Sequence, residues 1–239
     1  MALRVFIVAL MVAILTSFAA AQQTEKKQPA KKRAANPAYA QIEDDPKLPR
    51  VLLLGDSISI GYTLPTREML AGKANVHRPA TNCGPTTNGV TNLDSWLGDK
   101  KWDVIHFNFG LHDLKYVDEA SKNTSPDKGR PQVSLADYEK NLEQMVQRMK
   151  KTGAVLIFAT TTPVPPGEPQ RVHDDAVKYN AAARRVMEKH GVRINDLHAF
   201  CLPRLKEIQR PANVHFTPEG SEALAAEVAK AIEAALKKK

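Results

Sequence analysis

The chain has 239 residues, a formal net charge of +8, 43% hydrophobic residues and two cysteines. Most of the excess positive charge lies near the ends, because residues 51–236 carry 23 basic and 22 acidic side chains. This balance argues against a basic nucleic-acid-binding core, and two cysteines are too few for a disulfide framework.

The first residues have the pattern of an export signal. Arg4 precedes an apolar run from Val5 to Leu15, and Ala19-Ala20-Ala21 follows as a small-residue cleavage site. We therefore expect residues 1–21 to be a signal peptide and the mature protein to be secreted or periplasmic; an uncleaved membrane anchor is the alternative. No later stretch is apolar enough to cross a bilayer, so membrane contact is expected only through the signal segment.

Two further segments are set apart from the core by composition. Residues 22–49 are rich in Lys, Ala, Pro and Gln and predict a disordered basic linker. Residues 237–239 form a basic tail. The remaining span, 50–236, is long enough for one domain with a well-buried core.

Strands and helices alternate along this domain. Short apolar runs predict strands near residues 51–54, 74–78, 102–110, 154–160 and 192–195. Helical patterns follow each of them, and the first, over 58–73, is interrupted by Pro65. This alternation predicts an α/β protein with a parallel sheet and right-handed crossovers. Residues 114–133 are predicted to be a long polar loop, either functional or mobile.

The chain is organised around Val51-Leu52-Leu53-Leu54-Gly55-Asp56-Ser57. The apolar run is typical of a central strand buried on both faces, and Gly55 permits a tight turn after it. Ser57 then lies at the carboxyl end of the strand and at the start of a helix, where free N–H groups stabilise negative charge. Ser57 is therefore a candidate nucleophile, although a serine that only caps a helix is the alternative.

Other polar residues are expected at the same rim of the sheet. Gly84, His112 and Asp113 follow later strands, and His215 lies in the last loop. Acyl transfer needs a nucleophile, a base that takes its proton, and N–H donors for the oxyanion. No phosphate-binding glycine motif and no zinc-type His/Cys spacing is present, so no cofactor or metal is expected.

Four blocks of the sequence resemble those of the SGNH hydrolases, also called GDSL esterases or lipases, over residues 50–236. The blocks are Gly55-Asp56-Ser57, Asn82-Cys83-Gly84, Gly110-Leu111-His112-Asp113 and Ala212-Asn213-Val214-His215-Phe216-Thr217. The resemblance implies a flavodoxin-like three-layer α/β/α sandwich, with a five-stranded parallel sheet of order 2-1-3-4-5. It also implies ester hydrolysis, often of acetyl groups on carbohydrates.

The resemblance implies a role for each block. Ser57 would be the nucleophile and His215 the base, and the N–H groups of Ser57 and Gly84 would line the oxyanion hole. His112 stands where the family has Asn, and a neutral imidazole can also donate one N–H. Asp56 and Asp113 would be structural residues that support the site.

The family's acid, three residues before the histidine, is replaced by Ala212. Either a backbone carbonyl holds His215, or another acid reaches it, with Asp174 and Asp175 as the nearest candidates, or the enzyme is slow. We expect a neutral Ser57–His215 dyad. Cys83 and Cys201 are expected at opposite sides of the sheet and unpaired. The alternatives to a secreted esterase with a small-molecule or glycan ester substrate are a non-catalytic carbohydrate-binding protein and an O-acyltransferase.

Overall fold

A five-stranded parallel sheet forms the centre of the computed structural model, which describes residues 36–237. Its strand order is β2-β1-β3-β6-β7. The bounds are Arg50–Leu54 for β1, Asn75–His77 for β2, Val104–Phe107 for β3, Val155–Ala159 for β6 and Arg193–Asn195 for β7. These are the five strands expected from the sequence, and their order confirms the predicted 2-1-3-4-5 arrangement.

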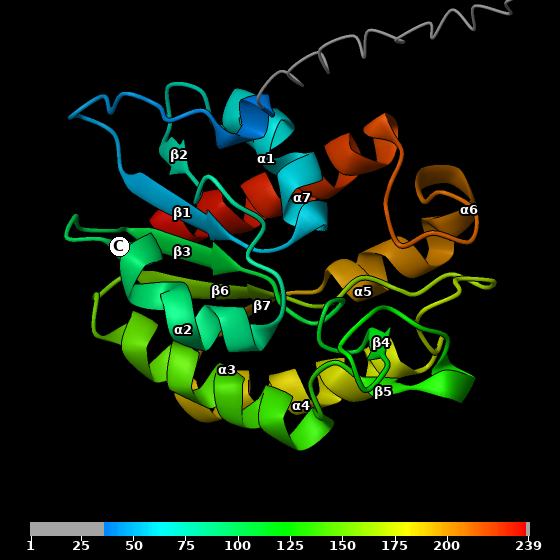
Figure 1. The fold of residues 1–239 in the computed structure, drawn as a ribbon. Helices are drawn as coiled ribbons and strands as arrows, with labels where there is room; N and C mark the ends of the chain where they lie inside the picture. The colour runs from blue at the N-terminus through cyan, green and yellow to red at the C-terminus, as the bar shows by residue number, and fades with distance from the viewer. Residues whose placement is uncertain (1–35, 238–239) are drawn as a thin grey trace, which may run out of the picture. The chain divides into compact units, whose positions relative to one another are not determined.

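Helices cover both faces of the sheet (Figure 1). Helices α1 (Ser57–Met69) and α7 (Pro218–Leu236) pack against each other on one face, and the other face carries α2 (Thr86–Leu97), α3 (Leu135–Lys150) and α4 (Asp175–His190). Shorter helices connect β7 to α7: α5 (Leu197–Cys201), η3 (Leu202–Arg204) and α6 (Leu205–Ile208). The result is the three-layer α/β/α sandwich that the family resemblance implies.

The central strands are buried on both faces because they carry almost only large apolar residues. Val51, Leu53 and Leu54 of β1 are fully buried, and Leu54 is in register with Phe107 of β3. The rings of Phe107 and Phe158 lie 5.4 Å apart across β3 and β6. Each such side chain stabilises the fold by about 1.5–3 kcal/mol when it leaves water. This core holds the carboxyl ends of β1 and β3 in place.

Helix α1 runs through Pro65 without a break, so the predicted interruption is wrong. A proline removes one hydrogen bond from the helix ladder, which here would go to Gly61 four residues earlier. The buried residues Tyr62 and Thr66 lie on either side of Pro65 in sequence, and α1 packs closely on α7. Packing of this face outweighs the single lost bond.

Residues 114–133 contain structure that the sequence did not predict. Two short antiparallel strands, β4 (Tyr116–Val117) and β5 (Arg130–Pro131), flank the 3₁₀ turn η2 (Pro126–Lys128). The Tyr116 N–H donates to the carbonyl of Gln170 at 2.8 Å, which ties this hairpin to the loop after β6. A strand of two residues leaves too short a pattern for periodicity to detect.

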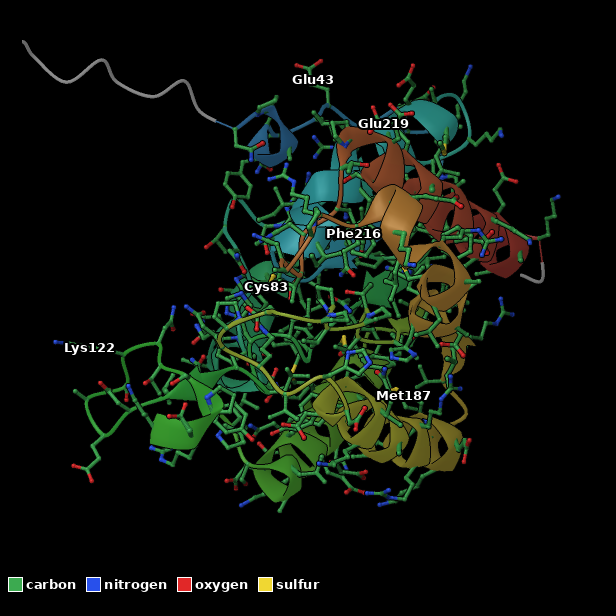
Figure 2. The ribbon with its side chains drawn as sticks, turned by 90° about the vertical axis from the view of Figure 1, so that its right-hand side faces the viewer. Glu43, Cys83, Lys122, Met187, Phe216 and Glu219 are labelled. Atoms are coloured by element: carbon green, nitrogen blue, oxygen red, sulfur yellow. The ribbon has the colours of Figure 1, made fainter. Side chains whose placement is uncertain are left out.

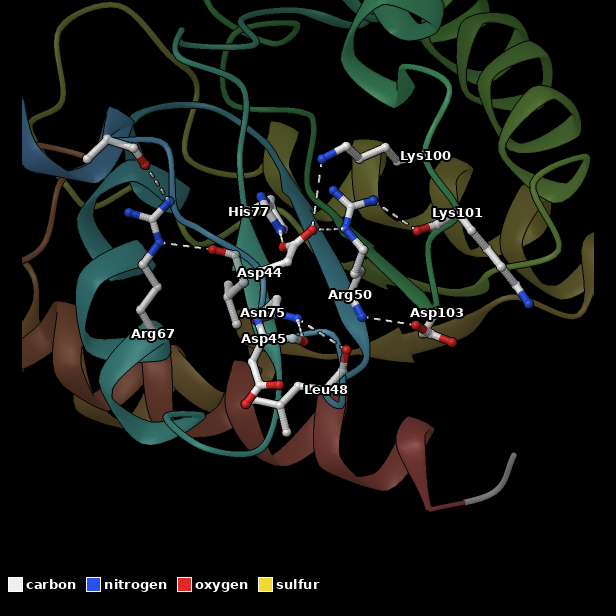
Figure 3. A network of polar contacts seen from close by, with 12 residues as sticks. Asp44, Asp45, Leu48, Arg50, Arg67, Asn75, His77, Lys100, Lys101 and Asp103 are labelled. Carbon is white, nitrogen blue, oxygen red and sulfur yellow. Dashed lines mark hydrogen bonds and ion pairs between the residues drawn. The ribbon is translucent and has the colours of Figure 1, made fainter.

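Residues 36–49 belong to the fold, although the sequence assigns them to the linker (Figure 3). The Asp44 carboxylate contacts Arg50 Nε at 2.9 Å and His77 Nε2 at 2.5 Å. Asn75 donates from Nδ2 to the carbonyls of Asp45 and Leu48. The one-turn helix η1 (Pro37–Tyr39) begins this segment. Composition averages over the segment and misses these few contacts, which depend on partners in β1 and β2.

The expected signal peptide, residues 1–21, lies outside the described residues, as do linker residues 22–35 and residues 238–239. Within residues 36–237 no helix is both long and apolar enough to cross a bilayer.

Cys83 lies inside the fold (Figure 2), and both cysteines are free and buried. Burial raises the pKa of Cys83 to about 11 and that of Cys201 to about 12, so both thiols are neutral at pH 7.

Gly110 offers a test of how tightly the loop after β3 is packed. Its φ is +152°, and a Cβ there would lie 1.8 Å from Thr161 Oγ1. Gly191 also has positive φ, +65°, but a Cβ there would meet nothing within 4 Å. We expect Gly191→Ala to lower the free energy of unfolding by about 1 kcal/mol from backbone strain alone. Gly110→Ala should cost about 3 kcal/mol more from the steric overlap. Urea unfolding of both variants measures this, and equal losses would contradict the predicted overlap.

Candidate active site

Ser57 is the first residue of α1 and follows the tight turn after β1. Asp56 caps the helix, because its Oδ1 accepts the Ile58 N–H at 3.0 Å. At the first helical position the Ser57 N–H has no partner in the helix ladder. The hydroxyl and this N–H therefore lie at the positive end of the α1 dipole.

His215 lies in the loop between α6 and α7 and reaches the same point. Its Nε2 is 2.9 Å from Ser57 Oγ, although 158 residues separate the two in sequence. This is the spacing at which a histidine can take the proton of a hydroxyl. Burial, with the nearby charges of Arg171 and Arg210, lowers the pKa of His215, so the ring is neutral at pH 7.

Asn213 orients the ring of His215. Asn213 Oδ1 accepts the His215 backbone N–H at 2.9 Å and lies 2.7 Å from Nδ1 of the same ring. Because the backbone group can only donate, the amide oxygen faces this side, and Nδ1 must carry the ring proton to donate to it. The lone pair on Nε2 then points at Ser57. The neutral amide thus selects the tautomer that a base requires.

The sequence analysis overlooked Asn213 and expected a dyad, with Asp174 or Asp175 as the nearest acids. Asp175 instead binds the Tyr116 hydroxyl at 3.2 Å and Lys178 at 2.8 Å, and Asp174 is the N-cap of α4. Ala212, at the family's acid position, has a left-handed φ of +48°. The available signal was an Asn two residues before the histidine, a spacing that favours local hydrogen bonds from the side chain to the backbone.

The loop that carries Gly84 is joined to the turn before Ser57, because the Cys83 N–H donates to the Gly55 carbonyl at 3.2 Å, but the Gly84 N–H is occupied. The group donates to Asn82 Oδ1 at 2.9 Å, and both Asn82 and Ser57 line one cleft. This contact of the Asn82 side chain with the backbone N–H two residues later is an Asx turn, and Gly84 follows in it with a φ of +64°. The family resemblance assigns the Gly84 N–H to the oxyanion hole. A substrate oxygen can bind this N–H only if it displaces Asn82 Oδ1.

His112 also lines the cleft and has no hydrogen-bond partner among residues 36–237. Burial, followed by the charges of Lys115 and Arg171, lowers its pKa to about 4. The ring is therefore neutral at pH 7 and keeps one N–H to donate. This agrees with a donor role and gives no sign that a neighbouring loop uses the ring.

Asp113 lies beneath the site and is fully buried. Its Oδ1 accepts from the backbone N–H of Thr86 at 2.9 Å and from the Thr86 hydroxyl at 2.5 Å. Burial raises the pKa of Asp113 to about 7. Asp113 thus holds the start of α2, and with it the loop that carries Gly84, against the end of β3.

Arg78 joins the loops that carry Ser57 and Gly84. Its side chain is buried, and Nη2 donates to the carbonyls of Gly55 at 3.3 Å and Thr81 at 3.1 Å. Nη1 donates to the hydroxyls of Ser59 and Thr63 in α1. Arg78 was not singled out from the sequence, because its partners are backbone carbonyls of distant segments.

Ser57, His215, Asn213 and His112 line a cleft of about 460 Å³, in which polar residues outnumber apolar ones. The polar residues that line it besides Ser57 and His215 include Asn82, His112, Lys115, Asn123, Glu168, Gln170, Arg171 and Asn213. A larger cavity of about 520 Å³ lies beside β2 and α2; His77 and Ser95 line it, but His77 binds Asp44 and Ser95 binds the Asn92 carbonyl. Within residues 36–237 no group of three or more His, Cys, Asp or Glu side chains is placed to hold a metal ion.

The comparison with protein families gives one match, to the GDSL-like Lipase/Acylhydrolase family, over residues 53–223. The chain belongs to this family. Every site residue named from the sequence, from Asp56 to His215, falls within the matched span. The protein is accordingly a serine hydrolase that acts on ester bonds.

Several solved structures have a similar fold. A lipase/acylhydrolase from Enterococcus faecalis is 21% identical, with a TM-score of 0.63, over 78% of this chain and 96% of that one. The acetyl xylan esterase AlAXEase is 19% identical, with a TM-score of 0.61, over 77% and 99%. The acetylxylan esterase Axe2 from Geobacillus stearothermophilus is 17% identical, with a TM-score of 0.62, over 76% and 93%. At these identities the similarity supports the fold alone. No curated protein matches the sequence.

Proposed function

We propose that this GDSL acylhydrolase removes O-acetyl groups from a carbohydrate, with Ser57 as nucleophile and His215 as general base. The observation that carries the proposal is the 2.9 Å contact between Ser57 Oγ and His215 Nε2 at the rim of a polar cleft. A hydroxyl and a neutral imidazole at this distance are the minimum set for covalent acyl transfer.

The reaction takes two steps. Ser57 Oγ attacks the ester carbonyl carbon while its proton moves to His215 Nε2, and the carbonyl oxygen becomes an oxyanion. The C–O bond to the sugar breaks, and His215 returns the proton to the leaving sugar oxygen. A water molecule, deprotonated by the same Nε2, then attacks the acetyl-enzyme. Acetate leaves, and Ser57 regains its hydroxyl proton.

Three donors are available to the oxyanion in this proposal. They are the Ser57 N–H at the start of α1, the Gly84 N–H and the ring N–H of His112. The Gly84 donor becomes available only when the Asn82 amide turns away, since Asn82 Oδ1 holds it in the free enzyme. Preorganised donors of this kind contribute about 2.7–4 kcal/mol each to lowering the barrier.

Asn213 is proposed as the residue that orients the base. When an amide replaces the acid of a triad, much of the roughly 10⁴-fold loss comes from stabilising the wrong tautomer. Here the backbone N–H of His215 holds the Asn213 oxygen toward Nδ1, so the correct tautomer is kept. The neutral amide does not place a negative charge next to Nδ1, where the acid of a triad would stabilise the imidazolium.

The nature of the cleft supports a carbohydrate substrate. Amide, carboxylate and cationic side chains dominate its lining, and these groups form hydrogen bonds with sugar hydroxyls. Two of the similar solved structures are described as acetyl xylan esterases. Export through the N-terminal segment is part of the same proposal, because polymeric glycans lie outside the cytoplasm; its support is the sequence pattern of residues 1–21.

The proposed nucleophile can be tested with a fluorophosphonate probe. Wild type should be labelled on the peptide that contains Ser57. Ser57→Ala should not be labelled and should lose acetate release from acetylated xylo-oligosaccharides by about 10³-fold or more. Ser95→Ala, an exposed serine in α2, should behave as wild type. An unlabelled wild type would favour a binding protein, and acetylated acceptor in excess of free acetate would favour an acyltransferase.

The role of Asn213 predicts a shift in pH dependence. The base must be neutral, so kcat/KM falls as pH drops through the pKa of His215, which burial places below its ordinary value of about 6.5. Asn213→Asp adds negative charge beside the imidazolium, raises this pKa and moves the acid limb to higher pH. Asn213→Ala should lower kcat about tenfold to hundredfold, the value of one or two hydrogen bonds. Unchanged pH profiles in both variants would remove Asn213 from the mechanism.

The contact between Asn82 and Gly84 predicts opposite effects of two substitutions. Asn82→Ala frees the Gly84 N–H and should raise kcat/KM about fivefold, the value of one neutral hydrogen bond. Asn82→Asp keeps the acceptor and adds a charge that repels the oxyanion, so kcat/KM should fall. Steady-state kinetics on 4-nitrophenyl acetate measure both, with Asn92→Ala in α2 as a control. If Asn82→Ala is slower than wild type, Asn82 positions the loop rather than competing with the substrate.

A further inference from the structure

Lys115 is a cation in the wall of the proposed active-site cleft. It follows the Gly110–Asp113 block by two residues and lines the same cleft as Ser57 and His215. The neighbouring Tyr116 N–H is tied to the Gln170 carbonyl at 2.8 Å, which holds this part of the chain against the opposite wall. Lys115 is half-buried, and among residues 36–237 it takes part in no salt bridge.

Glu168, a carboxylate in the lining of the same cleft, forms a salt bridge with Arg171. Arg171 Nη1 lies 2.8 Å from Glu168 Oε1, and its Nε donates to the Leu111 carbonyl at 2.8 Å. Glu168 Oε2 accepts the Gln170 N–H at 2.9 Å. Both side chains of the pair are less than 10% exposed. Glu168 is therefore paired with Arg171 and forms no salt bridge with Lys115.

The other titratable groups that line the cleft do not supply a counter-ion. His112 and His215 are neutral at pH 7, as their lowered pKa values require. Asp56 is 1% exposed, its Oδ1 accepts the Ile58 N–H at 3.0 Å, and it forms no salt bridge with Lys115. Burial and the charge of Arg171 lower the pKa of Lys115, so the ammonium is held where its charge is disfavoured. An anion that enters the cleft would stabilise the charged form of Lys115.

We propose that Lys115 binds a carboxylate on the sugar part of the ester, so that the preferred substrate is an O-acetylated uronic acid residue. This rests on the proposed esterase function. An acetyl group occupies the acyl side of the nucleophile and carries no charge, so the anion must come from the alcohol side. Arg171 Nη2 carries no hydrogen bond among the described residues, and a ligand carboxylate can share it with Lys115.

The test compares two substrates that differ only in charge, the mono-O-acetylated methyl glycosides of glucuronic acid and of glucose. Wild type should have a kcat/KM about five- to tenfold higher for the acid, and this preference should fall at high salt. Lys115→Met should bring the ratio of the two kcat/KM values, acid over neutral, to about one. Lys122→Met is the matched control: Lys122 lies at the outer end of the same hairpin (Figure 2), is exposed and does not line the cleft. It should keep the preference.

A binding measurement separates this inference from the proposed function. Ser57→Ala is titrated with the non-esterified methyl glucuronoside and methyl glucoside, with saturation-transfer difference NMR as the readout. The uronate should bind more tightly, and the added Lys115→Met substitution should remove the difference. If wild type hydrolyses neither ester but this difference holds, the esterase proposal fails and the anion site stands. Equal binding of the two sugars, or equal losses on both esters in Lys115→Met, would overturn the assignment of Lys115.

Discussion

The hydrogen bond between Ser57 and His215 is the contact on which the active site depends, and it joins residues 158 positions apart. Neither partner is held by its own neighbours alone. Ser57 is carried by the end of β1, which apolar contacts on both faces keep rigid, and His215 by a loop between α6 and α7. Because α7 packs on α1, the helix that begins at Ser57, the loop before α7 returns to the nucleophile. The packing of α7 on α1 thus sets the distance between Ser57 Oγ and His215 Nε2.

Buried polar side chains convert this rough placement into a defined geometry. Arg78 joins the loop before Ser57 to the loop before Gly84, and Asp113 fixes the start of α2. Burying an arginine or a carboxylate costs free energy unless hydrogen bonds replace those lost with water. Arg78 has neutral oxygens as partners, and Asp113 has a raised pKa. These groups lie around the nucleophile, where fixed donors and acceptors are needed for catalysis.

Strong local patterns were predictable, and features that depend on distant partners were not. The run Val51–Leu54 predicts a buried central strand, the alternation of strands and helices predicts a parallel sheet, and the family resemblance implies the strand order. The prediction of a helix break at Pro65 was wrong, because the free energy gained by packing α1 on α7 is larger than that of the one hydrogen bond lost. The linker prediction failed for residues 36–49, since Asp44 and Asp45 are held by partners that become neighbours only in the folded chain. Both errors are cases in which tertiary contacts override local propensity.

The fold class, the family and the candidate residues Ser57, Gly84, His112 and His215 follow from the sequence, because short motifs at strand ends carry that information locally. The contacts that each of these groups makes follow only from the folded chain. It placed Asn213 on the ring of His215, Asn82 on the Gly84 N–H, and Lys115 in a cleft whose Glu168 is paired with Arg171. The motifs indicate which residues lie at the same edge of the sheet. The hydrogen-bond partners and the protonation states of these residues depend on distances that the packing of the folded chain determines.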